Sequence, residues 1–130
     1  MLNLAFVWHM HQPFYRDLFS GEYVLPWVRL HGIKDYLDMA RILDSFPRLH
    51  QNFNFSPVLL EQIQEYANGG MEKDYYWQLS LKPPEALSLA EREFVWKNFF
   101  MANLENLIKA HPRYYELYLK RQKDEPLSTQ

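Results

Sequence analysis

Two histidines stand two residues apart in the stretch LNLAFVWHMHQPFY, residues 2–15, where an apolar run gives way to a proline. Side chains two apart on a strand point the same way, so His9 and His11 are expected to share a face at its end. Imidazole donates and accepts hydrogen bonds, and it also binds zinc. Three hypotheses follow: recognition of a hydroxyl-rich substrate, hydrogen bonding within the fold, or a zinc site with a third ligand such as His31 or His50.

A second candidate group lies in the segment PWVRLHGIKDYLDMA. Trp27 and His31 are one helical turn apart and therefore lie on the same face of a helix. They could present an aromatic wall and a polar donor to a sugar ring, or pack as an ordinary helix end. Glu61 and Glu65 have a similar i, i+4 spacing. The amphipathic pattern around these two carboxylates predicts a solvated helix face rather than acid/base chemistry.

The elements that must position these residues alternate between strand and helix. Residues 2–8 are mostly apolar, which is typical of a strand buried on both faces of a parallel sheet. A helix is expected from Pro26 to about residue 44. Residues 48–56 alternate and predict a second strand with one polar face, and a helix over 57–67 follows, capped by Ser56 and stopped by Asn-Gly-Gly. Strands joined through a helix are normally parallel, which predicts an α/β fold.

The second half of the chain has a helical character. Residues 71–87 are expected to form a connector. Ser88 and Glu91 match the capping box S-x-x-E, which predicts the start of a long helix that continues to about residue 110. A proline at position 112 interrupts this helix, and a further helix is expected after it.

Composition and charge exclude several classes of protein. The 130 residues are 48% hydrophobic and 23% charged, which is typical of a globular domain. The formal net charge of −2 argues against a nucleic-acid surface, and the lack of cysteine excludes disulfides and thiolate metal sites. No secretory signal or membrane-spanning run is apparent. We therefore expect a cytoplasmic protein that binds neither nucleic acid nor membrane.

Four stretches, in order, resemble one known family. FVWHMHQP resembles the first signature region of glycoside hydrolase family 57, which has an H-Q-P motif on its first barrel strand. PWVRLHGIKDYLDMA resembles the helical segment that follows in amylase-like and amylopullulanase-like members. NFNFSPVLLEQI is similar to the second strand and its Ser-Pro entry into the next helix, and residues 80–121 are similar to the helical insertion after it. The resemblance covers residues 2–121.

The resemblance implies the start of an incomplete (β/α)7 barrel, with two parallel strands and a large helical second half. It divides the chain into the first two β/α units at 1–70, a helical insertion at 71–123 and a flexible tail at 124–130. It implies action on α-glucans with retention of configuration, by a glutamate nucleophile and an aspartate acid/base. It implies no cofactor and no metal for the chemistry.

The same resemblance assigns the site residues. The family's first-strand histidines lie near the sugar bound at the cleavage point, so His9 and His11 inherit a substrate-binding role, with Gln12 beside them in the motif. Trp27 and His31 are further substrate-binding candidates, without a specific contact carried over from the family. No catalytic residue is expected, because the two catalytic carboxylates belong to later signature regions that this sequence lacks.

Two hypotheses of function follow. The first is the N-terminal part of a retaining α-glucan hydrolase or glucanotransferase, inactive alone, which binds an α-glucan or maltooligosaccharide. The alternative is a non-catalytic sugar-binding or interaction fragment. Two strands leave unpaired edges and an uncovered face. We therefore expect either a second chain that completes the barrel or self-association.

Overall fold

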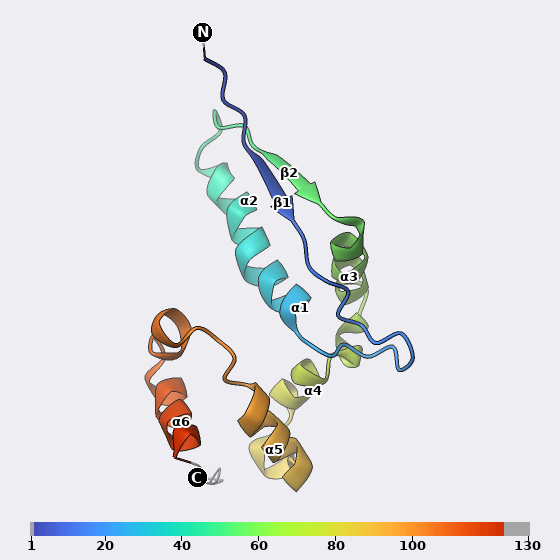
Figure 1. The fold of residues 1–130 in the computed structure, drawn as a ribbon, viewed down its shortest axis with the longest axis vertical. Helices are drawn as coiled ribbons and strands as arrows, with labels where there is room; N and C mark the ends of the chain where they lie inside the picture. Colours follow the sequence, from blue (N-terminus) through green and yellow to red (C-terminus); the bar gives the residue numbers. More distant parts are fainter. Residues whose placement is uncertain (1, 124–130) are drawn as a thin grey trace. The chain divides into compact units, whose positions relative to one another are not determined.

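The computed structural model describes residues 2–123 and divides into two compact units between Gln78 and Leu79. The tail expected at 124–130 lies outside the described residues, and the segments expected at 1–70 and 71–123 stay a prediction. The elements are drawn in Figure 1. In chain order they are β1 Val7–Met10, α1 Trp27–His31, a π turn Gly32–Tyr36, α2 Leu37–Asp44, β2 Asn52–Phe55, α3 Pro57–Ala67, a 3-10 turn Gly70–Lys73, α4 Tyr75–Leu81, a 3-10 turn Pro84–Ala86, α5 Leu89–Asn98, a π turn Leu104–Ile108 and α6 Pro112–Gln122.

The first unit is built on two parallel strands. β1 pairs with β2 so that His9 lies opposite Asn54 and Met10 opposite Phe55. Figure 1 shows α1 and α2 running beside the strands in the opposite direction. The predicted α/β class with two parallel strands is confirmed, and the arrangement is consistent with part of an open β/α barrel. The predicted start of the first strand is wrong: β1 begins at Val7, because β2 is only four residues long.

The two faces of this sheet differ in character. Met10 is buried, and Phe53 and Phe55 pack half-buried against the same core. Because side chains alternate along a strand, the intervening residues point the other way. The polar face expected for the second strand is confirmed, whereas the expected burial of the first strand on both faces is wrong. The opposite side of the sheet, called here the open face, consists of the exposed residues Val7, His9, Asn52 and Asn54.

The helix expected after Pro26 is present, but a π turn at Gly32–Tyr36 separates α1 from α2. In a regular α-helix, five residues rotate a side chain by about 500°, which is about 140° past a full turn. The i→i+5 bonding of a π turn instead brings the fifth residue back beneath the first. Tyr36 therefore lies below His31, with ring centroids 6.4 Å apart, and meets Phe55 of β2 at 6.2 Å.

Helix α3 follows β2 as predicted. It has Pro57 in its first turn, and the chain leaves it through Gly69, whose φ of +94° is a left-handed conformation that glycine tolerates best. The cap predicted at Ser56 is not formed. Its hydroxyl is buried and makes no hydrogen bond to the residues that the structure describes. Leu59, Gln62 and Tyr66 form the buried side of α3.

The core of the first unit contains a buried carboxylate. Asp74 has no exposed surface, and its oxygens accept hydrogen bonds from Arg29 Nε at 2.8 Å and from the Tyr66 hydroxyl at 3.1 Å. A buried charge is tolerated only when it is paired and hydrogen-bonded in this way. The Tyr66 ring also stacks on Tyr23 at 4.5 Å. Asp74 thereby ties α1, α3 and the start of α4 together.

The connector expected at residues 71–87 is wrong in part, because it contains the helix α4. Asp74 stands immediately before this helix and accepts a hydrogen bond from the backbone N–H of Trp77 at 3.1 Å, which is the geometry of a helix cap. The helix has only seven residues and begins with three aromatics, a composition with weak helix propensity.

The long helix expected from Ser88 to residue 110 is also wrong in part. The predicted capping box is confirmed, since Ser88 and Glu91 exchange both backbone-to-side-chain hydrogen bonds. However, α5 ends at Asn98, and the chain turns before a π turn over 104–108. Asn103 is extended, and its side chain accepts from the Asn106 N–H at 2.9 Å. An asparagine cap in mid-sequence therefore starts a new turn where the periodicity predicts continuous helix.

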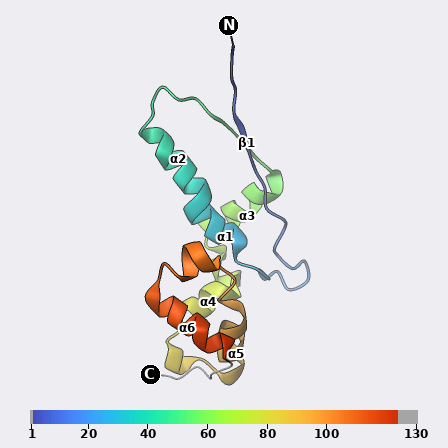
Figure 2. The same cartoon turned by 60° about the vertical axis from the view of Figure 1, so that its left-hand side comes forward.

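The second unit is held together by aromatic rings between α5 and α6, which Figure 2 shows beside each other. Phe100, just after α5, stacks on Tyr114 at 5.2 Å and meets Trp96 edge-on at 5.5 Å. The guanidinium of Arg121 lies over Phe100 and donates to the backbone carbonyl of Trp96 at 2.8 Å. Part of the unusually high aromatic content is therefore packing within this unit.

Candidate functional site

His9 and His11 lie at the carboxyl end of β1, and their rings are on the same side of the chain. The ring centroids are 5.7 Å apart with an angle of 36° between the planes, and both residues are exposed. The shared face predicted from the two-residue spacing is therefore observed. In open α/β sheets, ligands bind beyond the carboxyl ends of the strands, which is where these imidazoles stand.

Asn54 on β2 is a residue that sequence reasoning did not select for the site. Its side-chain oxygen lies 2.7 Å from His9 Nδ1, directly across the parallel pair. An asparagine oxygen is an acceptor, so the bond places the proton on Nδ1 in neutral His9 and leaves Nε2 as an acceptor. The polar alternation of the second strand was visible in the sequence, but the register that pairs these two residues was not.

Gln12 is held from two sides by tyrosines. Its Nε2 donates to the Tyr36 hydroxyl at 3.0 Å, and its Oε1 accepts from the Tyr15 hydroxyl at 3.2 Å. Burial and the neighbouring Tyr36 raise the pKa of Tyr15 above its usual range, so this hydroxyl keeps its proton and remains a donor. The amide of Gln12 retains a second N–H and a second lone pair that these two bonds do not use.

Trp27 and His31 meet on one side of α1, as their spacing predicts. Their ring centroids are 6.0 Å apart, and both residues are partly buried. His31 Nδ1 lies 2.5 Å from Asp35 Oδ2, and Lys34 adds an ion pair to the same carboxylate at 3.0 Å. The hydrogen bond to His31, followed by the contacts with Lys34, holds the pKa of Asp35 below its usual range. The carboxylate therefore stays ionised and orients the imidazole ring.

The five predicted site residues fall into two groups. The first is the histidine pair with Asn54 on the open face, and the second links Trp27, His31 and Gln12 through the ring and hydroxyl of Tyr36. Over residues 2–123, no hydrogen bond or ring contact joins the two groups directly, and the backbone from His11 to Gln12 connects them.

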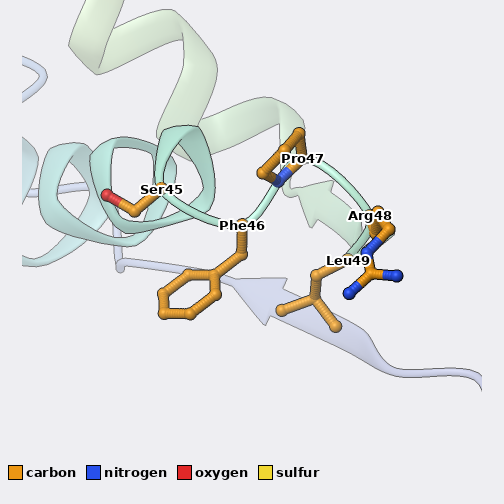
Figure 3. A pocket seen from close by; sticks show the side chains of 5 residues that line it. All are labelled: Ser45, Phe46, Pro47, Arg48 and Leu49. Atoms are coloured by element: carbon orange, nitrogen blue, oxygen red, sulfur yellow. The ribbon is translucent and has the colours of Figure 1, made fainter.

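Two hollows in the first unit lie away from the histidine pair. One of about 390 Å³ is formed by the turn between α2 and β2, at the amino ends of the strands, and Figure 3 shows its five lining residues 45–49. An apolar groove of about 630 Å³ runs between α1 and α3 on the covered side of the sheet and includes Tyr36 and Trp77. The histidine pair lines neither of them. No group of three or more potential metal ligands occurs among the described residues.

The solvated face expected at Glu61 and Glu65 is wrong for Glu65. Its carboxylate accepts from Lys73 Nζ at 2.7 Å and from the Tyr23 hydroxyl at 2.8 Å, and it pairs with Arg16 at 3.1 Å. These partners come from the loop before α1 and the turn after α3. Glu65 therefore serves as an anchor within the first unit.

Comparison with known families identifies the relationship of this chain. The family model described as glycosyl hydrolase family 57 matches residues 5–128, which is nearly the whole chain. No curated protein and no solved structure gives a match. Over residues 2–123, no helix combines the length and the apolar character that crossing a bilayer requires.

Proposed function

The chain belongs to glycosyl hydrolase family 57, and from this premise we propose that it forms the α-glucan-binding N-terminal part of a retaining hydrolase or glucanotransferase. In this proposal the histidine pair binds hydroxyl groups of the sugar at the cleavage point. We further propose that the protein acts in carbohydrate metabolism in the cytoplasm, with a maltooligosaccharide or longer α-glucan as its ligand. The chemistry requires no cofactor and no metal.

One observation carries the proposal. His9 and His11 present two exposed imidazoles 5.7 Å apart on the open face, at the carboxyl end of β1. The bond from His9 Nδ1 to Asn54 fixes the orientation of the first ring. His9 keeps an acceptor at Nε2 because its Nδ1 proton is bonded to Asn54, and His11 can both donate and accept, which suits a ligand whose neighbouring hydroxyls do both.

The second group of residues supports the same assignment. Trp27 supplies an aromatic surface for the apolar face of a sugar ring. His31 is oriented by the ionised Asp35, and Gln12 is held by Tyr15 and Tyr36 with one donor and one lone pair to spare. Fixed side chains bind at a lower entropic cost than mobile ones.

The catalytic carboxylates are assigned to other polypeptide. A retaining mechanism requires two carboxyl groups about 5–5.5 Å apart on either side of the bond. The carboxylates that the first unit holds most firmly, Glu65 and Asp74, are engaged in ion pairs within the fold. We therefore expect the chain alone to bind sugar without cleaving it.

A fluorescence titration tests the binding. Maltoheptaose added to the chain should give a saturable change in tryptophan emission, because Trp27 belongs to the second group of site residues. His9→Ala and His11→Ala should abolish the change. His50→Ala is the matched control, since His50 is exposed and precedes β2 at the other end of the sheet. A wild-type chain that shows no saturable change would refute the proposal.

An activity assay tests the assignment of the carboxylates. The pure chain should release no reducing sugar from starch, pullulan or maltoheptaose above a blank. Turnover that disappears in His11→Ala would contradict this expectation. Saturable binding without turnover fits both the partial enzyme and the alternative, a non-catalytic sugar-binding fragment. Activity that appears when the missing strands are added as a second chain would decide for the partial enzyme.

A further inference from the structure

Gln62 is a fully buried amide that forms hydrogen bonds with the segment after the first strand and with its own helix. It lies on the inner side of α3 with no exposed surface. Its Nε2 donates to the Pro13 carbonyl at 2.9 Å and to the Val58 carbonyl at 3.0 Å, and its Oε1 accepts from the Tyr15 N–H at 2.8 Å. The amide therefore grips the backbone on both sides of Phe14.

The segment that Gln62 holds, residues 13–15, directly follows His11 and Gln12. At its beginning, the Met10 carbonyl accepts a hydrogen bond from the Ser56 N–H at 3.0 Å, where β2 ends. At its other end Gln62 holds Pro13 and Tyr15. The intervening residues 11 and 12 are thus held between two fixed points, one at the β2–α3 junction and one within α3.

A side-chain route reinforces the backbone route. Tyr15, whose N–H is bonded to Gln62, uses its hydroxyl to donate to Gln12 Oε1 at 3.2 Å. Gln62 therefore acts on Gln12 both through Pro13 and through Tyr15. A neutral amide can donate to both carbonyls and accept from the N–H at the same time. An ionised glutamate keeps only the acceptor, and a methionine of similar length keeps neither.

We propose that Gln62 is a positioning residue for the sugar site: it sets the direction in which the chain after β1 presents His11 and Gln12. This inference rests on the proposed function only for the ligand. The geometric part, that Gln62 fixes the placement of the His11 ring, is tested without any sugar.

The test compares Gln62→Met with Gln64→Met, the matched change at an exposed residue of the same helix. In Gln62→Met, exchange of the Tyr15 amide hydrogen should accelerate by about tenfold or more, as expected for the loss of one buried hydrogen bond. The ring resonances of His9 and His11 should shift in NMR spectra, while those of His50 and His111 stay in place. Maltoheptaose should bind about tenfold more weakly. Gln64→Met should change none of these.

A folded Gln62→Met with unchanged Tyr15 exchange and unchanged His11 resonances would overturn the proposal. If this variant does not fold, Gln62→Leu decides, because leucine keeps much of the volume but can neither donate to Pro13 nor accept from Tyr15. It should move the His11 resonance in the same direction, and no movement overturns the proposal. Failure of both variants to fold, with Gln64→Met folded, assigns Gln62 to the fold alone and also overturns it.

The two proposals fail separately. If wild-type protein binds no maltoheptaose but the His11 resonance moves in Gln62→Met, the sugar-binding function is wrong and the positioning role stands. If wild-type protein binds the sugar and Gln62→Met binds it equally well with His11 unmoved, the positioning role is wrong and the function stands.

Discussion

Asp74 satisfies three donors at once from the interior of the first unit. Asp74→Ala leaves the guanidinium of Arg29 without its carboxylate and the Tyr66 hydroxyl without its acceptor. Breaking one side of a buried ion pair costs about 3–5 kcal/mol. Urea unfolding should show this loss, whereas Asp38→Ala, at an exposed carboxylate of α2, should change the free energy of unfolding by less than about 0.5 kcal/mol. Equal losses for the two variants would contradict the assigned role.

Glu65 predicts how stability depends on pH. Burial alone raises its pKa, but hydrogen bonds from Lys73 and Tyr23, with the charge of Arg16, outweigh burial and hold the pKa below the usual 4.5. A carboxyl of this kind stabilises the fold above its unfolded-state pKa, and the contribution is lost as the pH falls through its folded-state pKa. Between about pH 5 and pH 3 the wild type should lose stability more steeply than Glu65→Gln. Urea unfolding at several pH values measures both slopes, and parallel slopes would exclude this role.

The contacts of a single residue could be predicted only when its partners lie close to it in the sequence. The shared side of His9 and His11 follows from a period of two residues, which needs no tertiary information. The partners of Gln62 are 47 and 49 residues away in sequence, and His9 is 45 residues from Asn54. Such pairs depend on the register between β1 and β2 and on the placement of α3, neither of which a periodic pattern specifies.

At the scale of the elements, two helix starts looked alike in sequence and differ in structure. Ser88 accepts from the Glu91 N–H, whereas the Ser56 hydroxyl makes no hydrogen bond within the described chain. Ser88→Ala should therefore destabilise the second unit by about 1 kcal/mol. Ser56→Ala should change the stability of the first unit by less than about 0.5 kcal/mol. Denaturation followed by NMR signals of each unit measures both values, and equal losses would show that both caps operate in solution.

The sequence predicted helices well where an apolar face and a first-turn proline occur together, as in α3. It predicted them less well where a single capping side chain determines the start of the helix. Asp74 caps the start of α4, and Asn103 caps the π turn that follows α5. Each side chain accepts a hydrogen bond from a backbone N–H. Both residue types are also common in loops, so their presence alone does not distinguish a cap from a turn. The π turn in the helix after Pro26 was not foreseen either, because the apolar spacing around it still fits a regular helix.

At the scale of the whole molecule, the parallel pairing of β1 and β2 could be predicted from the helix that connects them. The exposure of the first strand could not be predicted in this way. Within residues 2–78, β1 and β2 have no further strand beside them, and the residues of the open face are exposed. Val7 on that face exposes 67% of its surface. Unpaired strand edges with an exposed apolar side chain beside them are a typical site of association between copies or with a completing chain.

We therefore expect the chain to self-associate, with an average mass in light scattering that rises with concentration. Val7→Lys should weaken this association, because a charge on the strand opposes edge pairing and apolar contact. Leu89→Lys is the control, since Leu89 is 82% exposed but lies at the start of α5 in the other unit. A single monomeric species at every concentration would rule out the expectation.

The π turn accommodates one residue more between His31 and Tyr36 than a regular helical turn would. In an ordinary α-helix the fourth residue after His31 lies about 40° past a full turn and therefore on the same face of the helix. Loss of one residue within 32–35 would consequently restore ordinary winding and still leave the phenol ring of Tyr36 on the side of Gln12 and Phe55. This segment should therefore tolerate a deletion that would turn every later side chain away from its neighbours in a regular helix.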